Sequence, residues 1–255
     1  MLFLAAIFSL NFLTAILYNV LYAAVFFAGL AILLTRALSK PEQWWYRCRA
    51  LAESVKTLTW RYVMHAVPFS ENDAQARIAL RNHLHEIFRE NLATANMVTS
   101  DWSGNDQITH FMDKVRAMNL QQRMEYYLKH RVDEQRTWYK NKAKANRKWS
   151  RHCVWGGSAI YLVSGFMVLL RIYEPDWQYW PTEPLILVAA SIVGWMQIKK
   201  YNELAAAYTV AAHEIGLIRP MADAISTDEE FSEFVNDAEK AFSREHTLWI
   251  ARKSD

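Results

Sequence analysis

Residues 2–34 contain no charged side chain, which strongly limits the folds open to this chain. One helix over this run would be roughly 50 Å long, well beyond the ~30 Å hydrocarbon thickness of a bilayer. Either a single steeply tilted helix or a hairpin of two shorter helices would fit. We favour the hairpin, with spans at about 2–17 and 20–36 and a turn near Tyr18–Asn19.

Two more apolar runs, 154–170 and 185–198, lie close together in the second half of the chain. The loop between them is acidic and aromatic, whereas basic residues lie on the far sides of both runs, in 131–149 and at Lys199–Lys200. Positively charged flanks stay in the cytoplasm. The sequence therefore predicts a second transmembrane hairpin, with spans at about 153–171 and 183–199, and cytoplasmic termini.

Amphipathic patterns outside the apolar runs predict cytosolic helices. The longest begins near Leu120 and runs toward residue 170, and Gly156–Gly157 could bend it. The last helix begins with a capping-box sequence at Thr227–Glu230. One side of that helix carries an apolar stripe that must dock on another element: Phe231, Phe234, Val235, Ala238, Phe242 and Trp249. The other expected helices cover residues 50–64, 72–95, 107–117 and 201–218.

The predicted fold class is therefore all-α: an integral membrane protein with two transmembrane helical hairpins and long cytosolic helical extensions. Residues 1–98 form the first module, 99–119 a linker and 120–255 the second module. A short pattern supports this duplication, because Tyr46-x3-Ala50-x-Ala52-x2-Val55 recurs from Tyr201 as Tyr-x3-Ala-x-Ala-x2-Val.

The sequence carries no recognisable catalytic or cofactor motif. It has no HExxH, no glycine-rich phosphate loop and no Gly-x-Ser-x-Gly elbow. His83 and His85 face about 200° apart on a helix and cannot share a metal ion. The two cysteines, Cys48 and Cys153, do not form a disulfide framework, and both are expected to be reduced. We expect no enzymatic activity, no cofactor, no metal site and no nucleic-acid partner.

One helical face combines Arg131, Gln135, Trp138 and Lys142, at i, i+4, i+7 and i+11. Two interpretations remain open for it. The face is solvated, with Trp138 packed and Lys142 extended toward water, or it is a polar seam in which Arg131 meets a carboxylate such as Glu53 or Glu214.

Within the expected spans, small residues offer points of close helix approach: Gly157, Gly165, Ala190 and Gly194. Helix packing explains them better than a pore lining. Between their ends the spans carry no acidic or basic side chain, so a pore built from them would be weakly selective.

Several segments together resemble the SLATT domains, the SMODS and SLOG-associating two-transmembrane effectors. The first is Arg131-Val-Asp-Glu-Gln135-x2-Trp138-Tyr139-x2-Lys142-Ala143, followed by two membrane helices. The exit helix of a preceding copy is similar to the stretch from Trp45 to Tyr62, with Glu53, Lys56 and Trp60. Glu245-His246-Thr247-x-Trp249 also fits. Tandem members would carry a basic helix ahead of the first hairpin, so either the natural protein starts upstream of Met1 or the first module has a shortened N-terminus.

This resemblance implies a bacterial inner-membrane effector of a conflict or antiphage system, which oligomerises and forms a pore or disrupts the membrane. The implied partners are membrane lipid, further copies of the chain and a nucleotide-sensing protein. The alternative is a membrane-anchored scaffold or sensor whose cytosolic helical bundle recruits a signalling partner.

Overall fold

The computed structural model describes residues 8, 16–39, 41–91, 107–176 and 180–251. Every regular element in these ranges is a helix, so the predicted all-α class is confirmed there. The chain forms two compact units, which we call unit 1 (residues 1–40 and 140–209) and unit 2 (residues 41–139 and 210–255). Each unit draws on both halves of the sequence, whereas the predicted modules follow the chain order.

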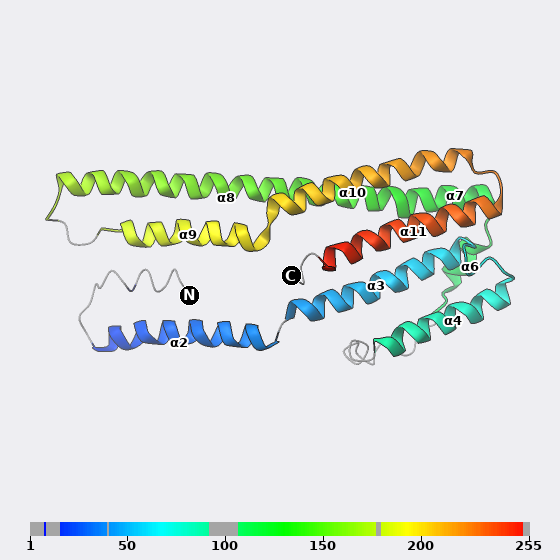
Figure 1. The fold of residues 1–255 in the computed structure, drawn as a ribbon, viewed down its shortest axis with the longest axis horizontal. Coiled ribbons are helices and arrows are strands. Elements are labelled where there is room, and N and C mark those ends of the chain that lie inside the picture. The colour runs from blue at the N-terminus through cyan, green and yellow to red at the C-terminus, as the bar shows by residue number, and fades with distance from the viewer. Residues whose placement is uncertain (1–7, 9–15, 40, 92–106, 177–179, 252–255) are drawn as a thin grey trace. The chain divides into compact units, whose positions relative to one another are not determined.

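Unit 1 contains the apolar helices. These are α2 (Ile16–Ser39), the greater part of α8 (Glu134–Tyr173), α9 (Thr182–Lys199) and the beginning of α10 (Tyr201–Met221). Figure 1 shows α8 and α9 as an antiparallel hairpin. The helices approach closely at Gly157, where an added Cβ would lie 3.8 Å from Cγ2 of Ile192. The Ser150 hydroxyl donates a hydrogen bond of 2.7 Å to Asn202 Oδ1.

The first apolar run contradicts one of our predictions. Because α2 is continuous from Ile16, the turn expected near Tyr18–Asn19 lies inside a helix. Phe8 nevertheless lies against this helix: the Tyr18 hydroxyl donates to its carbonyl at 2.7 Å, and its ring stacks on Tyr22 at 5.9 Å. A single straight helix would separate positions 8 and 22 by about 21 Å. The tilted single helix is therefore excluded, while the expected span 2–17 lies almost wholly outside the described residues.

A single residue separates α9 from α10. Lys200 has a positive φ of 48°, and its N–H donates to the carbonyl of Met196 at 2.9 Å, which ends α9. The left-handed conformation is uncommon for a residue with a side chain. The apolar helix consequently ends at the Lys199–Lys200 pair that the sequence suggested as a basic border.

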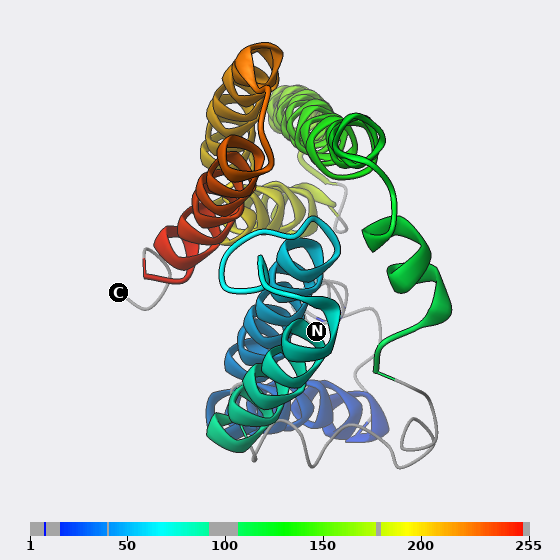
Figure 2. The same cartoon turned by 90° about the vertical axis from the view of Figure 1, so that its right-hand side faces the viewer.

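Unit 2 is a helical bundle, which Figure 2 views nearly end-on. Helix α3 (Pro41–Val63) packs on α4 (Asp73–Glu90), α6 (His110–Arg116) and α11 (Asp228–Ala251). Helix α11 also packs on α7 (Leu120–Tyr127). The unit is completed by the π-helix η2 (Leu128–Asp133), the first turns of α8, the end of α10 and the short 3-10 helix η3 (Ala222–Ala224).

The helix starts follow the capping signals of the sequence. Pro41 begins α3, where its missing N–H costs nothing. Asn72 caps α4, and its side chain accepts from Gln75 N. The capping box of α11 is confirmed: Thr227 Oγ1 accepts from Glu230 N at 3.2 Å, and Glu230 Oε2 accepts from Thr227 N at 3.1 Å. Hydrogen bonds from the backbone N–H groups of Ser226 and Thr227, together with one from the Ser226 hydroxyl, lower the pKa of Glu230.

The apolar stripe of α11 docks inside unit 2. Phe231, Val235, Ala238 and Phe242 are all buried, so the prediction that this stripe must dock is confirmed for these residues. Of the stripe's six members, the side chain of Trp249 lies outside the described ones.

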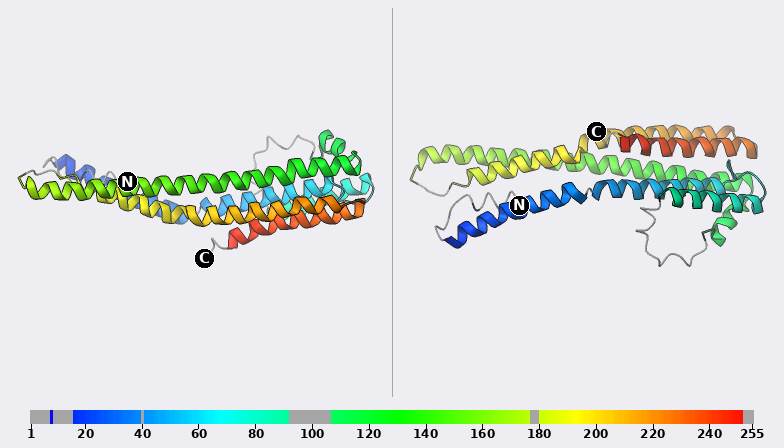
Figure 3. Two further views of the ribbon diagram at one scale, coloured as in Figure 1. Left: turned by 90° about the horizontal axis from the view of Figure 1, so that it is seen from above. Right: turned by 60° about the horizontal axis from the view of Figure 1, so that its bottom comes forward.

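Residues 120–173 are helical throughout, as predicted, but the irregularity lies elsewhere than expected. Gly156 and Gly157 are inside α8, while six residues near its start form the π-helix η2 (Figure 3). A π-helix has more residues per turn than an α-helix. The helix face that is buried before η2 is therefore rotated relative to the face that is buried after it. Up to the middle of η2 the buried positions are four residues apart: Arg123, Tyr127 and Arg131. From Val132 onward the less exposed positions of α8 follow a regular alternation of four and three residues: Val132, Arg136, Tyr139, Ala143, Asn146, Ser150, Cys153, Gly157, Ile160, Ser164 and Met167.

Two buried arginines hold the turn that follows α3. Arg116 donates to the carbonyls of Tyr62, Phe69 and Glu71, and its Nε lies 2.8 Å from Asp73 Oδ1. Arg123 donates to the Met64 carbonyl at 3.1 Å and to Asp228. These guanidinium groups satisfy carbonyls that the end of a helix leaves without partners.

Candidate functional site

The interior of unit 2 is organised by an ion pair between Arg131 of η2 and Glu239 of α11. The two side chains are 1% and 0% exposed. Arg131 donates through Nε to Glu239 Oε1 at 2.8 Å and through Nη2 to Oε2 at 2.6 Å, which is a bidentate pair. This geometry gives strong, directional hydrogen bonds. The pair therefore fixes α11 against η2 in one register.

Three further residues add hydrogen bonds to this pair. The Tyr127 hydroxyl donates to Glu239 Oε1 at 2.9 Å, and the Thr57 hydroxyl donates to Oε2 at 3.0 Å. Glu53 of α3 accepts from Arg131 Nη2 at 3.2 Å. A buried charge is tolerated only when it is paired and hydrogen-bonded in this way. We call these five residues the Arg131–Glu239 cluster.

The third guanidinium nitrogen of Arg131, Nη1, gives one residue of the apolar stripe a second role. Nη1 is buried and has no hydrogen-bond partner among the described residues. The guanidinium carbon lies 4.9 Å from the centroid of the Phe242 ring, so an aromatic face covers the charge. Phe242 thus serves both the core of unit 2 and its buried cation.

Beside the cluster lies a groove of about 390 Å³ between α3 and the start of α8. Trp60 and Trp138 contribute aromatic walls, and Arg49 lies within 5.7 Å of the Trp138 ring centroid. Lys56 also lines the groove; partial burial, followed by the charge of Arg131, lowers the pKa of its ammonium. The groove therefore combines indole surfaces with cations near the cluster.

The residues that were singled out in the sequence lie in the Arg131–Glu239 cluster, in the groove beside it, or on the surface. Arg131 meets Glu53, while Gln135, Trp138, Lys56 and Trp60 line the groove. Tyr139 is buried. Lys142 and Glu214 are exposed, and no hydrogen bond or ion pair joins Glu214 to a described residue. The structure thus brings Arg131 to one of its two expected carboxylates.

Sequence reasoning missed Glu239, the main partner of Arg131. The signal was present, because Glu239 lies four residues after Val235 and three before Phe242, within the apolar stripe of α11. A carboxylate on an otherwise apolar face requires a buried partner.

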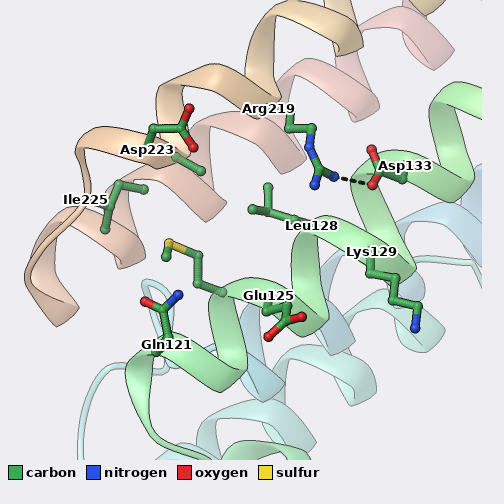
Figure 4. A pocket seen from close by; sticks show the side chains of 10 residues that line it. Gln121, Glu125, Leu128, Lys129, Asp133, Arg219, Asp223 and Ile225 are labelled. Atoms are coloured by element: carbon green, nitrogen blue, oxygen red, sulfur yellow. Dashed lines mark hydrogen bonds and ion pairs between the residues drawn. The ribbon is translucent and has the colours of Figure 1, made fainter.

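A second cavity of unit 2, about 480 Å³, lies between α7–η2 and the end of α10 (Figure 4). An ion pair between Asp133 and Arg219 bounds one side, and Leu128 and Ile225 supply apolar surface. Its lining carries three carboxylates, Glu125, Asp133 and Asp223, and two cations, Lys129 and Arg219.

The helices of unit 1 expose apolar surface. No residue of α2 is buried, and on α8 the side chains of Leu162, Phe166 and Leu169 are largely exposed. Two helical stretches are long and apolar enough to cross a membrane: Ile16–Ser39 and the rod Leu120–Tyr173. Helix α9 has 18 residues but carries Glu183 and Lys199 near its ends, so its apolar part is shorter, and its span stays a prediction.

The four small residues expected to mediate helix packing lie in different surroundings. Gly157 is buried against Ile192. Gly165, Ala190 and Gly194 are exposed, and a Cβ added at either glycine would meet nothing within 4 Å. Within one chain, the neighbouring Ala189 is buried instead of Ala190.

Neither cysteine is bonded: Cys48 is exposed and Cys153 is half-buried. Among the described residues, no three His, Cys, Asp or Glu side chains are grouped closely enough to hold a metal ion. His83 lies near Glu86, at 3.8 Å, on the surface of α4.

Comparison with known families identifies both halves of the chain. The model of SMODS and SLOG-associating 2TM effector domain 3 matches residues 1–124. The model of SMODS and SLOG-associating 2TM effector domain 1 matches residues 127–249. This is a tandem SLATT protein. The predicted family is thereby confirmed. No curated protein and no solved structure matches the chain.

The family matches assign each of the five residues of the Arg131–Glu239 cluster to one of the two SLATT domains. Glu53 and Thr57 belong to the first SLATT domain, whereas Tyr127, Arg131 and Glu239 belong to the second. All five lie within unit 2. The Arg131–Glu239 cluster consequently joins the two SLATT domains through buried polar contacts.

Proposed function

We propose that this protein is a non-enzymatic effector of the bacterial inner membrane, which oligomerises and permeabilises that membrane in a conflict or antiphage system. The observation that carries the proposal is the match of both halves to two-transmembrane effector domains. Two apolar, exposed helical stretches of membrane-spanning length support it.

The exposed small residues of unit 1 support oligomerisation. Helices in a membrane associate through close backbone approach at glycine and alanine. Gly165, Ala190 and Gly194 are exposed, and among the described residues nothing lies within 4 Å of a Cβ added at either glycine, so these positions are available to another copy. The apolar stretches within α2 and α8 carry no ionisable side chain, so such a pore would discriminate weakly between ions.

The charge distribution supports an orientation with cytoplasmic termini. The α8 segment ahead of the apolar stretch is rich in lysine and arginine, and Lys199–Lys200 follow α9. Basic flanks of this kind remain on the cytoplasmic side. Unit 2 then lies in the cytoplasm, where a nucleotide-sensing partner protein would reach it.

A scaffold or sensor role is the second candidate, and the groove between α3 and α8 favours it. Exposed indoles with adjacent cations are typical of binding surfaces for other molecules. In this alternative, the membrane helices only anchor a bundle that recruits a signalling partner.

The experiment that separates the two roles uses two neighbouring glycines of α8. Gly157→Leu introduces a side chain against Ile192 and should push α9 away from α8, whereas Gly156→Leu faces open space. We expect rapid loss of membrane potential in bacteria expressing wild type or Gly156→Leu, and none with equally abundant Gly157→Leu. Membrane potential that stays unchanged with all three proteins would favour the scaffold.

A further inference from the structure

One face of α8 changes its chemistry along the helix. Its members are separated by three, four or seven residues, so they lie on one side, and all of them are exposed. The face runs from cations through an indole to leucines, in this order: Lys140, Lys144, Lys148, Arg151, Trp155, Leu162 and Leu169. Every member belongs to unit 1.

The cations of this face have no partner. Within the described ranges, no hydrogen bond or ion pair involves the side chains of Lys140, Lys144, Lys148 or Arg151, whereas nearby Arg147 donates to Thr209 at 3.0 Å. No acidic residue occurs between Glu134 and Glu174, so α8 supplies no carboxylate beside or beyond these cations. The face is therefore an uncompensated positive row.

Helix α9, the other arm of the hairpin, also carries a cation next to a tryptophan. Lys199 follows Trp195 by four residues, and its Nζ lies 4.7 Å from the centroid of the indole. Arg151 precedes Trp155 by four residues on the antiparallel α8. Tryptophan prefers the boundary between hydrocarbon and head groups, with lysine and arginine just outside it. Both helices thus mark a water–lipid boundary at the level of an indole.

Distance along α8 decides which cations can reach lipid. Measured from Trp155 at 1.5 Å per residue, Arg151 lies roughly 6 Å outward and Lys148 roughly 10 Å. Lys144 and Lys140 lie roughly 16 and 22 Å outward. Charges are screened over about 8 to 10 Å at physiological salt. Only the first two cations therefore interact strongly with phosphates beside Trp155.

We propose that Lys148 and Arg151, above Trp155, form a binding site for the head groups of acidic phospholipids. The row is continuous with an apolar membrane face, which favours a lipid over a soluble acidic partner. This inference rests on the membrane insertion of the second hairpin, as in the proposed function, but it does not require a pore.

The test measures lipid preference next to the site. In a background with Cys48→Ser, Cys153→Ser and His152→Cys, a small fluorophore on position 152 reports nearby lipid in reconstituted vesicles. The vesicles contain phosphatidylcholine and phosphatidylglycerol, with brominated chains on one lipid or on the other. Quenching by each brominated lipid gives their relative association with this point of α8.

Two variants with equal charge change separate the site from general electrostatics. We expect Lys148→Gln/Arg151→Gln to lower the preference for phosphatidylglycerol by about five-fold or more, since one cation near the surface is worth about that factor. Lys140→Gln/Lys144→Gln should change it less than about two-fold, because of screening. High salt should weaken the wild-type preference.

The outcomes are distinct. Equal quenching by both lipids in wild type, or an equal loss in both double variants, would overturn the lipid site and leave membrane insertion standing. No quenching by either lipid would overturn insertion itself and, with it, the proposed function. Dye release from the same vesicles reports permeabilisation separately.

Discussion

Unit 2 buries three arginines, whereas unit 1 exposes the cations of α8 and most of its described leucines. In unit 2, Arg116, Arg123 and Arg131 are at most 5% exposed and each has carbonyl or carboxylate partners. In unit 1, Lys148 and Arg151 project from a helix whose outer face continues as leucine. Such an inversion is expected when water surrounds one region and hydrocarbon the other.

The largest effect should come from breaking the buried ion pair of unit 2. Glu239→Leu leaves Arg131 with Glu53 alone, and we expect a loss of about 3 to 5 kcal/mol in unfolding free energy. Thermal unfolding in detergent, followed by circular dichroism, measures this. Glu214→Leu, at an exposed position of α10, is the control and should change it by less than about 0.5 kcal/mol.

Removing both charges of the Arg131–Glu239 pair tests whether the uncompensated charge causes the loss of stability. In Arg131→Met/Glu239→Leu no uncompensated charge remains, so most of the lost stability should return. A double variant as unstable as Glu239→Leu would show that the remaining contacts of Arg131, and not its charge, hold unit 2 together.

Two exposed leucines test whether the two units have different surroundings. Leu162 in unit 1 and Leu217 in unit 2 are 76% and 71% exposed. Leu162→Arg should impair membrane insertion by about 2.5 to 3.5 kcal/mol, the cost of arginine near the centre of a spanning helix. Leu217→Arg should be neutral in the same insertion assay. Equal tolerance of both substitutions would contradict a membrane location for α8.

A smaller effect is expected at the start of α11. Thr227→Ala removes the side-chain oxygen that accepts from Glu230 N and should cost about 1 kcal/mol. Thr227→Ser keeps that oxygen and should retain most of the stability. Urea unfolding in detergent compares the two variants, and identical midpoints would show that the cap contributes nothing.

The smallest change should appear with pH in unit 2. Burial, and next the charge of Arg116, lowers the pKa of His65, so the folded chain disfavours its protonation. Stability is therefore complete above about pH 6.5, the usual histidine value, and is lost as pH falls toward the lowered pKa. Asp73, whose pKa is lowered first by its hydrogen bond with Arg116, responds only in a more acid range. His65→Gln should flatten the profile between pH 7 and 5; an unchanged slope would exclude His65 as its source.

Local signals predicted the helices well. The capping box at Thr227–Glu230 predicted a helix start, and uncharged runs predicted membrane-length helices, because these properties depend on nearby residues. The turn near Tyr18–Asn19 was wrong: neither residue breaks a helix, and the Tyr18 hydroxyl is held by the Phe8 carbonyl.

The candidate site was only partly predictable. Arg131 and Glu53 both lie in segments that resemble SLATT motifs. Arg131 and Glu239, in contrast, are 108 residues apart, and no local sequence pattern connects them. The π-helix at Leu128–Asp133 also escaped prediction, because its sequence suits an α-helix equally well. It is tertiary contact on both sides of this turn that favours the wider helix.

The split of the Arg131–Glu239 cluster between two SLATT domains has a consequence during synthesis. Thr57 leaves the ribosome 182 residues before Glu239, an interval of roughly 9 to 36 seconds at usual elongation rates. For that time, helix α3 has neither its buried acceptor nor the α11 surface that covers it. In this protein the first SLATT domain is thus open to chaperones until the second has been synthesised, and either domain expressed alone would lack these contacts permanently.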